Sequence, residues 1–243
     1  MRTAFYAGAS GLLAAQKGMD NLANNVANVS TAGYKPQNIS FQSLIYDEMY
    51  VNTPTDPEKG HGVKAEINDT DFSQGSLLPT NYPLDFAIIS DALFAIEQDG
   101  AIGYTRAGNF NIGLIGETGY LVTQSGGFVL DKNGQKIALE KQAGTNNFDT
   151  TNLANRIGLF TFANENYLTP VNDNLFVVSQ KSGEAVAVDS NEGKIVQSAL
   201  EQSSTILSEK MVEMITMQRA YQLSARVVSV AEENQQTING LRR

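Results

Sequence analysis

The sequence predicts an α+β protein in which long N- and C-terminal helices pair as a coiled-coil-like assembly domain, with a mainly antiparallel β domain inserted between them. Both ends of the chain carry apolar residues at helical spacing, and the middle alternates short apolar runs with glycine-containing turns. We expect the helical domain to comprise residues 1–34 and 200–243, and the β domain to comprise residues 35–199.

The first helix is predicted over about residues 4–30. With Phe5 at heptad position a, every a and d position over four heptads is apolar or small. Gly33 would end this helix in a left-handed conformation, and Pro36 would prevent it from resuming. The a positions are Phe5, Leu12, Met19 and Val26, and the d positions are Gly8, Ala15, Leu22 and Val29.

The end of this helix is rich in asparagine, which is a mediocre helix former. Residues 20–35 read DNLANNVANVSTAGYK, and Asn21, Asn25 and Asn28 fall on one stripe. Our hypothesis is that these amides contact neighbouring chains, and that the segment stays unfolded until a neighbour arrives. Asn25 and Asn28 therefore belong to the predicted assembly interface.

The middle of the chain predicts antiparallel strands. Turn signals of the DG, TG, GG, NG and SG types separate apolar runs of four to seven residues, and no amphipathic helix of ten residues is evident. The clearest runs are LDFAII, ALFAIEQ, YLVTQ, GFVLD and NLFVVSQ.

The last helix is predicted over about residues 203–241, with Ser203 or Ser204 as its N-cap. Its apolar stripe shifts at Ala231 and continues to Ile238 and Leu241. We assign the first part of the stripe to the assembly interface, in which Gln218 is the one polar residue. Its members are Leu207, Met211, Met214, Gln218, Tyr221, Ala225 and Val228.

The two terminal helices should not be stable alone. Gly8, Gly11 and Gly18 each cost roughly 0.8–1 kcal/mol relative to alanine inside a helix. Two complementary stripes at opposite ends of the chain therefore indicate that the ends pair with each other or with neighbouring copies. On the first helix the interface prediction comprises Phe5, Leu12, Met19, Leu22, Asn25, Val26, Asn28 and Val29.

Composition and charge exclude several classes of function. The net charge is −9, and residues 35–199 carry −10, which is opposite to the basic face of a nucleic-acid binder. The chain has no cysteine, and no window of 18 apolar residues that would insert in a membrane. The N-terminus lacks the apolar core of a signal peptide, so we expect any export to use another route.

The sequence makes no strong case for a catalytic residue, a metal site or a cofactor. His61 is the single histidine and lies between glycines, which is typical of a loop. Asp69 and Asp71 could form an acid–base pair on a strand, but a solvated turn before Phe72 is the simpler interpretation. The DKNGQK run at 131–136 lacks calcium-loop spacing, and its Asn-Gly pair predicts a two-residue hairpin.

Three blocks in chain order resemble the bacterial flagellar rod and hook proteins. They are DNLANNVANVSTAGYK, then LDFAIISDALFAIEQDGAIGYTRAGNF with YLVTQSGG, and finally ALEQSSTILSEKMVEMITMQRAY. Two segments depart from the family pattern. Ser90-Asp91-Ala92-Leu93 replaces a glycine-containing run, and Ser204-Thr205 replaces Asn-Val. The matches include Gly33, Tyr34, Lys35, Asp85, Tyr104, Arg106, Gly108, Glu201, Met211, Gln218 and Tyr221.

The resemblance implies a structural, non-enzymatic subunit of the flagellar basal-body rod in the cell envelope. It implies a helical tube formed by the terminal helices, with other rod and hook proteins as partners and export through the flagellar secretion apparatus. It implies no cofactor, no metal, no nucleic acid and no membrane insertion. The length favours a proximal or distal rod subunit, with a slight preference for the proximal type.

Two alternatives remain open. One is a hook-type subunit of the same family. The other belongs to a different class: a β-domain hydrolase that uses either the pair Asp69 and Asp71 or His61, or a binding module on a helical stalk.

Overall fold

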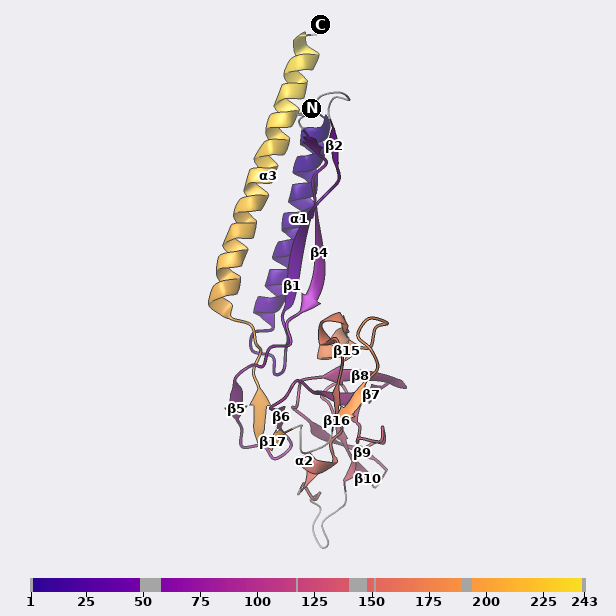
Figure 1. The fold of residues 1–243 in the computed structure, drawn as a ribbon. Helices are drawn as coiled ribbons and strands as arrows, with labels where there is room; N and C mark the ends of the chain where they lie inside the picture. Colours follow the sequence, from indigo (N-terminus) through magenta and orange to yellow (C-terminus); the bar gives the residue numbers. More distant parts are fainter. Residues whose placement is uncertain are drawn as a thin grey trace. The chain divides into compact units, whose positions relative to one another are not determined.

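The structure is a computed structural model that describes residues 2–48, 58–116, 118–139, 148–150, 152–188 and 194–241. By its internal contacts the chain divides into two compact units, which we describe separately (Figure 1). The helical unit comprises Met1–Ala27, Gln37–Asp69 and Ile206–Arg243, and the β unit comprises Asn28–Pro36 and Thr70–Thr205.

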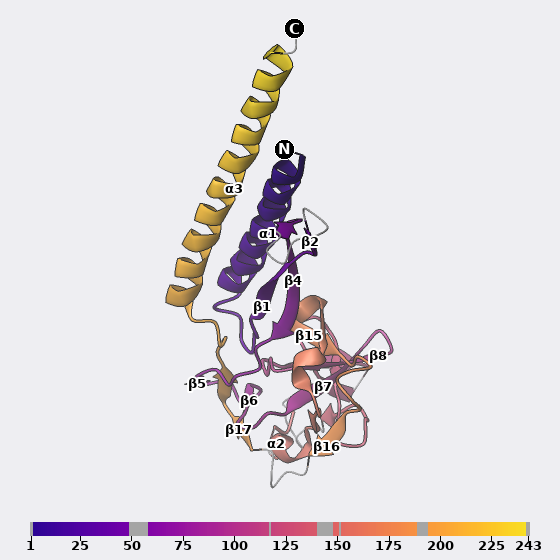
Figure 2. The ribbon, with the colours of Figure 1, turned by 45° about the horizontal axis from the view of Figure 1, so that its top comes forward.

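Two long helices, α1 (Arg2–Ala27) and α3 (Leu207–Leu241), lie side by side in the helical unit (Figure 2). They run in opposite directions, because Gly8 lies beside Val228 while Gly18 lies beside Met217. The two predicted helices are therefore confirmed as elements. Coiled-coil packing between them stays a prediction.

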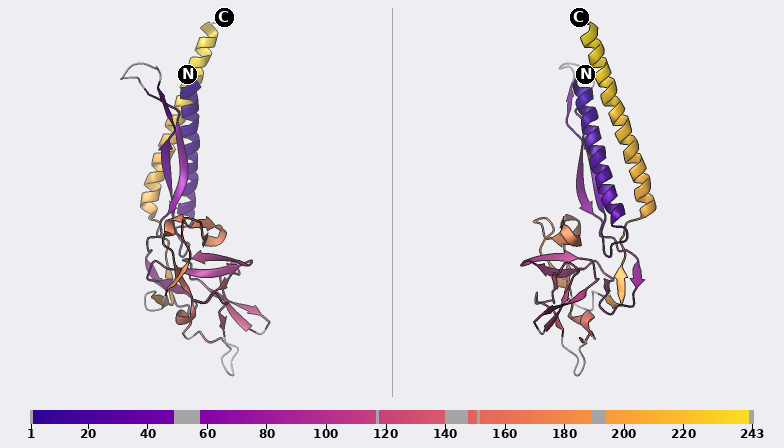
Figure 3. Two further views of the ribbon diagram at one scale, coloured as in Figure 1. Left: turned by 45° about the vertical axis from the view of Figure 1, so that its right-hand side comes forward. Right: turned by 180° about the vertical axis from the view of Figure 1, so that it is seen from behind.

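Two strand pairs complete the helical unit. Strand β1 (Gln37–Ser43) pairs with β4 (Val63–Thr70), and β2 (Tyr46–Glu48) pairs antiparallel with β3 (Glu58–Gly60). The β1–β4 pair runs along α1 (Figure 3), to which it is joined by hydrogen bonds from both strands. By contacts, residues 37–69 thus group with the helices, whereas the predicted boundary at residue 35 placed them with the β domain.

The β unit is built on a ten-stranded antiparallel sheet centred on β7 (Leu93–Gln98). Strand β7 pairs with β8 (Ala101–Thr105), β11 (Phe128–Val129) and β13 (Leu159–Thr161). The other strands of this sheet are β9 (Asn111–Ile115), β10 (Thr118–Val122), β12 (Ala138–Leu139), β14 (Thr169–Val171), β15 (Leu175–Val177) and β16 (Val186–Val188).

Two smaller strand pairs bring distant parts of the chain into the β unit. Strand β5 (Leu77–Pro79) pairs with β18 (Ala199–Glu201), and β6 (Phe86–Ile88) pairs with β17 (Ile195–Gln197). Among the described residues between α1 and α3, the helices are all short: α2 (Leu153–Arg156), η1 (Glu165–Tyr167) and η2 (Asn172–Asn174). The predicted mainly antiparallel β domain without a long helix is confirmed for this part of the chain.

Strand β7 separates two apolar clusters because its side chains alternate between the two faces of the sheet. Phe94 and Ile96 belong to one cluster, together with Phe86, Phe110 and Leu121. Leu93 and Ala95 belong to the other, which also contains Phe72, Tyr104, Phe162, Leu168 and Phe176.

Two predicted helix boundaries were wrong. Helix α1 ends at Ala27, six residues before Gly33, so Gly33 does not terminate it. Helix α3 begins at Leu207, and its first turn closes with a hydrogen bond from the Lys210 amide to the Ile206 carbonyl oxygen. Ser203 is not the N-cap, because its hydroxyl oxygen instead accepts a hydrogen bond from the Thr205 amide, and Ser204 also precedes the helix.

The predicted hairpin at residues 131–136 is present, but its turn differs from the expected one. The Gly134 amide donates to the Asp131 carbonyl oxygen, so Lys132 and Asn133 occupy the centre of the turn. Gly134 has φ +73°, and Asn133 has no positive φ, which excludes the two-residue turn centred on Asn-Gly. Gly134 serves as the left-handed residue that follows the turn.

Candidate assembly surface

The contact between α1 and α3 uses glycines where the two backbones come close. A Cβ atom added at Gly8 would lie 2.9 Å from Cγ2 of Val228, and one added at Gly11 would lie 2.9 Å from Oγ of Ser224. A Cβ atom at Gly18 would lie 3.2 Å from the sulfur of Met217. The glycines lower the helix propensity of α1, and in return they let α3 approach it closely.

The buried stripe of α1 matches the predicted d positions. Gly8, Ala15 and Leu22 are buried, whereas the a positions Phe5, Leu12, Met19 and Val26 are partly buried. Ala14 and Gly18, which lie beside this stripe, are also buried. Helix α1 therefore packs against the rest of its unit along a broad face.

Asn25 fixes the end of α1 to strand β1. Its side-chain Nδ2 donates to the Gln37 carbonyl oxygen at 2.9 Å, and its Oδ1 accepts from the Gln37 amide at 3.1 Å. It also donates to Oδ1 of Asn21 at 3.3 Å, and the Asn25 side chain is fully buried. The structure thus gives Asn21 and Asn25 partners within the chain, and their contact with a neighbouring chain stays a prediction.

The remaining predicted residues at this end of the chain, Asn28 and Val29, lie beyond α1 in the β unit. Both are partly buried, and Oδ1 of Asn28 accepts a hydrogen bond from the Thr31 hydroxyl. Their part in an assembly interface stays a prediction.

The predicted stripe of α3 divides into covered and exposed members. Met214, Ala225 and Val228 are partly buried, and the side of α3 that carries Met217 and Val228 faces α1. The other members of the predicted stripe are exposed, namely Leu207, Met211, Gln218 and Tyr221. No described residue of α3 is buried.

Helix α3 has a second apolar face, which the sequence analysis did not predict. Val212, Leu223 and Val230 are 60%, 61% and 54% exposed. At 100° per residue these three side chains lie within about 20° of each other, and roughly 120–160° around the helix from Met217 and Val228. Ile215 lies at the edge of the same face and is also exposed.

The spacing of this face could have been found, because residues 212, 223 and 230 are separated by eleven and seven. Arg219 and Arg226 interrupt it, and this hides the pattern. A similar pair on α1, Tyr6 and Leu13, is seven residues apart and is strongly exposed. We define the outer apolar face as the four residues of α3, Val212, Ile215, Leu223 and Val230.

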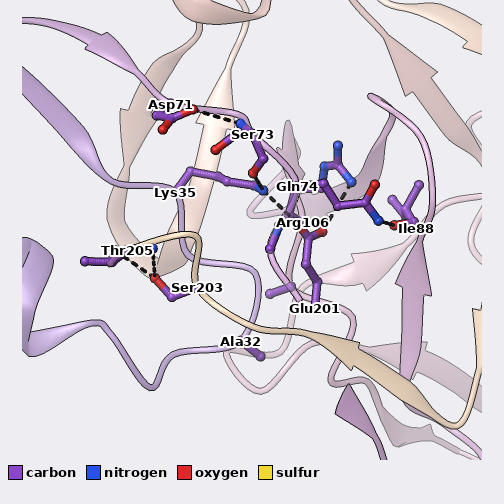
Figure 4. A network of polar contacts seen from close by, with 12 residues as sticks. Ala32, Lys35, Asp71, Ser73, Gln74, Ile88, Arg106, Glu201, Ser203 and Thr205 are labelled. Atoms are coloured by element: carbon purple, nitrogen blue, oxygen red, sulfur yellow. Dashed lines mark hydrogen bonds and ion pairs between the residues drawn. The ribbon is translucent and has the colours of Figure 1, made fainter. Parts of the chain in front are cut away.

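The β unit contains a buried ion cluster formed by Lys35, Arg106 and Glu201 (Figure 4). Nζ of Lys35 lies 2.6 Å from Oε1 of Glu201, and Nη1 of Arg106 lies 3.2 Å from Oε2. All three side chains are at most 1% exposed. Two bases thus share one carboxylate out of contact with water.

Backbone groups hold the cluster in place. Nζ of Lys35 also donates to the Ser73 carbonyl oxygen at 2.6 Å, and Oε1 of Glu201 also accepts from the Gly75 amide at 2.9 Å. Burial lowers the pKa of the Lys35 ammonium, while the hydrogen bond and negative charge of Glu201 oppose that shift. Buried charges require such partners, because desolvation alone would disfavour their ionised forms.

Glu165, at the start of η1, lies within electrostatic reach of this cluster. Burial raises the pKa of its carboxyl group, and the negative charge of Asp91 raises it further. Arg106 and Lys35 act in the opposite direction. Glu165 therefore favours its neutral form more than an exposed glutamate does.

The sequence placed Lys35, Arg106 and Glu201 in three separate blocks and did not connect them. Lys35 and Glu201 are 166 positions apart, and Arg106 and Glu201 are 95 apart. No local pattern reports such a contact. The one available signal was a charged side chain inside each of three blocks that resemble one family.

Two of the residues weighed for chemistry, Asp69 and Asp71, lie where strand β4 ends. Oδ1 of Asp71 accepts a hydrogen bond from the Ser73 amide, as in a turn, and Asp69 is exposed at the end of β4. Among the residues that the structure describes, no group of three or more His, Cys, Asp or Glu side chains could hold a metal ion. Within the same residues, no helix combines the length and apolarity needed to cross a bilayer.

Both ends of the chain match protein-family models. Residues 5–35 match the model described as "Flagella basal body rod protein". Residues 196–241 match the model described as "Flagellar basal body rod FlgEFG protein C-terminal". The two matched segments contain most of α1, all of α3 and two members of the ion cluster, Lys35 and Glu201.

Curated proteins of similar length match along the whole chain. "Flagellar basal-body rod protein FlgG" of Bacillus subtilis (strain 168) is 30% identical over 100% of both chains. The protein of the same name in Borreliella burgdorferi is 31% identical, again over 100% of both. "Flagellar basal-body rod protein FlgF" of Mesorhizobium japonicum is 30% identical over 93% of this chain and 91% of the relative.

Proposed function

Since this chain belongs to the family of flagellar basal-body rod proteins, and is thereby a structural subunit of the flagellar rod, we propose that it enters the rod by self-assembly through α1 and α3. The outer apolar face is the surface that would contact neighbouring subunits. Other rod and hook proteins would contact it at the two ends of its own segment of the rod.

The observation that carries this proposal is the exposure of Val212, Leu223 and Val230 on the side of α3 away from α1. A soluble monomer gains nothing from three large aliphatic side chains aligned in water, and such surfaces mark interaction sites. Helix α3 would thus use one side for α1 of its own chain and the other for a neighbour. Heptad-like packing of this kind would give the assembled helices their coiled-coil character.

The flagellar basal body is the location that the family assigns. We include passage through the flagellar export apparatus in the proposal. The low stability expected of α1 alone supports it, because an element that folds only against a partner can be kept unfolded at low cost.

Leu223→Asp tests the assembly surface directly. A carboxylate at the centre of an apolar contact between helices would be desolvated without a partner, so we expect no incorporation into basal bodies and no swimming. Gln222→Asp adds the same charge at the neighbouring exposed position and should assemble and swim.

Circular dichroism and thermal unfolding of both purified variants would show that the subunit itself still folds. Normal rods and normal swimming with Leu223→Asp would remove this face from the assembly interface. Loss of swimming in both variants would have the same meaning, because the effect would then come from charge in general.

A further inference from the structure

The two segments that connect the helices to the β unit are hydrogen-bonded to each other. The N-terminal connector comprises residues 28–36, and the C-terminal connector comprises residues 202–205. The Gly33 amide donates to the Glu201 carbonyl oxygen at 2.7 Å, immediately before the C-terminal connector. The Ser204 amide donates to the Tyr34 carbonyl oxygen at 3.4 Å.

The buried ion cluster lies at this junction. Lys35 belongs to the N-terminal connector, Glu201 adjoins the C-terminal one, and Arg106 follows strand β8 of the sheet (Figure 4). Glu201 contacts both bases through its side chain and Gly33 through its backbone. One residue thus ties both connectors to the core of the β unit.

The three charges are not equivalent. If Glu201 loses its charge, Lys35 and Arg106 become two buried cations close together with no carboxylate in hydrogen-bonding contact among the described residues. If Lys35 loses its charge, Arg106 and Glu201 remain as an ion pair. Loss of the Glu201 charge should therefore destabilise the junction more than loss of the Lys35 charge.

The junction also changes the entropy of pairing the helices. Residues 28–206 separate α1 from α3, and bringing the ends of such a long segment together is entropically unfavourable. With the connectors joined, Gly33 is six residues from the end of α1, and Ser204 is three residues from the start of α3. Short tethers of this kind raise the effective concentration of one helix for the other.

We propose that the ion cluster of Lys35, Arg106 and Glu201 is a conformational device that holds the two connectors together and so keeps α1 and α3 paired within a single subunit. This role goes beyond assembly into the rod, because it acts in one copy of the chain. Opening the cluster would free both helices without any change in their own sequences.

Hydrogen exchange on the dilute full-length monomer tests the proposal with Glu201→Gln. Exchange in the connectors, α1 and α3 should become on the order of a hundredfold faster, as expected when one partner of a buried ion pair is removed. Strands β7 and β8 should stay protected. Glu97→Gln is the matched control, because Glu97 forms a partly exposed ion pair with Lys136. We expect this variant to leave exchange in the connectors, α1 and α3 unchanged.

The direction in which Lys35→Met changes hydrogen exchange provides a second test. In the unaltered chain this substitution should speed exchange in the connectors, because it removes a favourable ion pair. In the Glu201→Gln background it should slow that exchange, because it removes one of two uncompensated cations. A loss of ordinary packing would change exchange in the same direction in both backgrounds.

The proposal is overturned if α1 and α3 keep their normal protection in Glu201→Gln, or if Lys35→Met acts in the same direction in both backgrounds. If Glu201→Gln instead unfolds β7 and β8, Lys35→Met alone decides. It must then open the connectors and both helices while β7 and β8 stay protected, and any other pattern contradicts the proposal.

Discussion

The amide of Gly33 donates a hydrogen bond to the carbonyl oxygen of Glu201 over 2.7 Å, although the two residues are 168 positions apart. Gly33 can do this because its φ of +65° turns the chain against Arg106 and Ala107, the residues that follow strand β8. A Cβ atom at this position would lie 2.4 Å from the carbonyl carbon of Arg106. Both the conformation and the close approach require glycine.

A non-glycine residue in the left-handed conformation costs about 1–3 kcal/mol by itself. Gly33→Ala should therefore lower the free energy of unfolding of the β unit by more than this. Gly126→Ala is a suitable control, since Gly126 has φ +88° and no atom within 4 Å of an added Cβ. Urea unfolding of the two variants would separate the clash from the strain. Equal losses of stability would mean that the contact with Arg106 adds nothing.

Gly8→Leu should separate α1 from α3. A Cβ atom added at this position would lie only 2.9 Å from Cγ2 of Val228, so a larger side chain must displace α3. We expect lower helicity by circular dichroism in the monomer. Gly240→Ala is the reverse case, because an added Cβ meets no atom within 4 Å there, and it should stabilise α3 by about 0.8–1 kcal/mol. Unchanged helicity in Gly8→Leu would contradict the glycine contact.

Asn25→Ala should lower the stability of the helical unit, even though alanine is the better helix former. The substitution removes both hydrogen bonds to Gln37 and leaves the partly buried amide and carbonyl groups of Gln37 without those partners, at a cost of about 1–3 kcal/mol. Gln16→Ala changes an exposed side chain of α1 and should be neutral or slightly stabilising. The measurement is thermal unfolding followed by circular dichroism of the helices. Higher stability of Asn25→Ala would restore the view that this residue weakens the helix.

Glu165 should make the stability of the β unit depend on pH. Its pKa is higher in the folded protein than in the unfolded chain, so the folded state binds more protons in the range between the two values. Stability from this group is present at low pH and is lost as the pH rises through that range, which begins near the usual glutamate value of 4.5. Glu165→Gln should thus unfold at a higher temperature than the unaltered chain at pH 7, with the advantage shrinking towards pH 4.

The control for this pH dependence is Glu184→Gln, which changes an exposed glutamate of the same unit. The pH profile of the unfolding temperature should change more in Glu165→Gln than in this control. A profile of Glu165→Gln parallel to that of the unaltered chain would show that Glu165 titrates alike in the folded and unfolded states.

The predictable part of the fold is the part that periodicity controls. The heptads of α1 and α3 and the short runs between turns correspond to real elements, because side-chain spacing follows directly from backbone geometry. Gly33 was predicted to act locally, as a helix stop, whereas its actual partners are Arg106 and Glu201. Likewise, Asn25 was assigned to an outside contact because its partner Gln37 lies in a strand that the sequence did not place beside α1.

The candidate surface was predicted in part for the same reason. A single helix has two sides available, and the sequence does not say which apolar residues face a partner in the same chain. Met214 and Val228 are partly buried in the subunit, whereas the outer apolar face around Leu223 was missed. Only tertiary contacts distinguish the two sides.

The position of β7 between two apolar clusters bears on how the β unit responds to mechanical load. Phe94 and Leu93 are adjacent residues that fill opposite sides of one strand, so neither cluster can shear without moving the other. Close-packed interiors of this kind have low compressibility and transmit strain. In an assembled rod, the β unit would therefore respond to load as one stiff body.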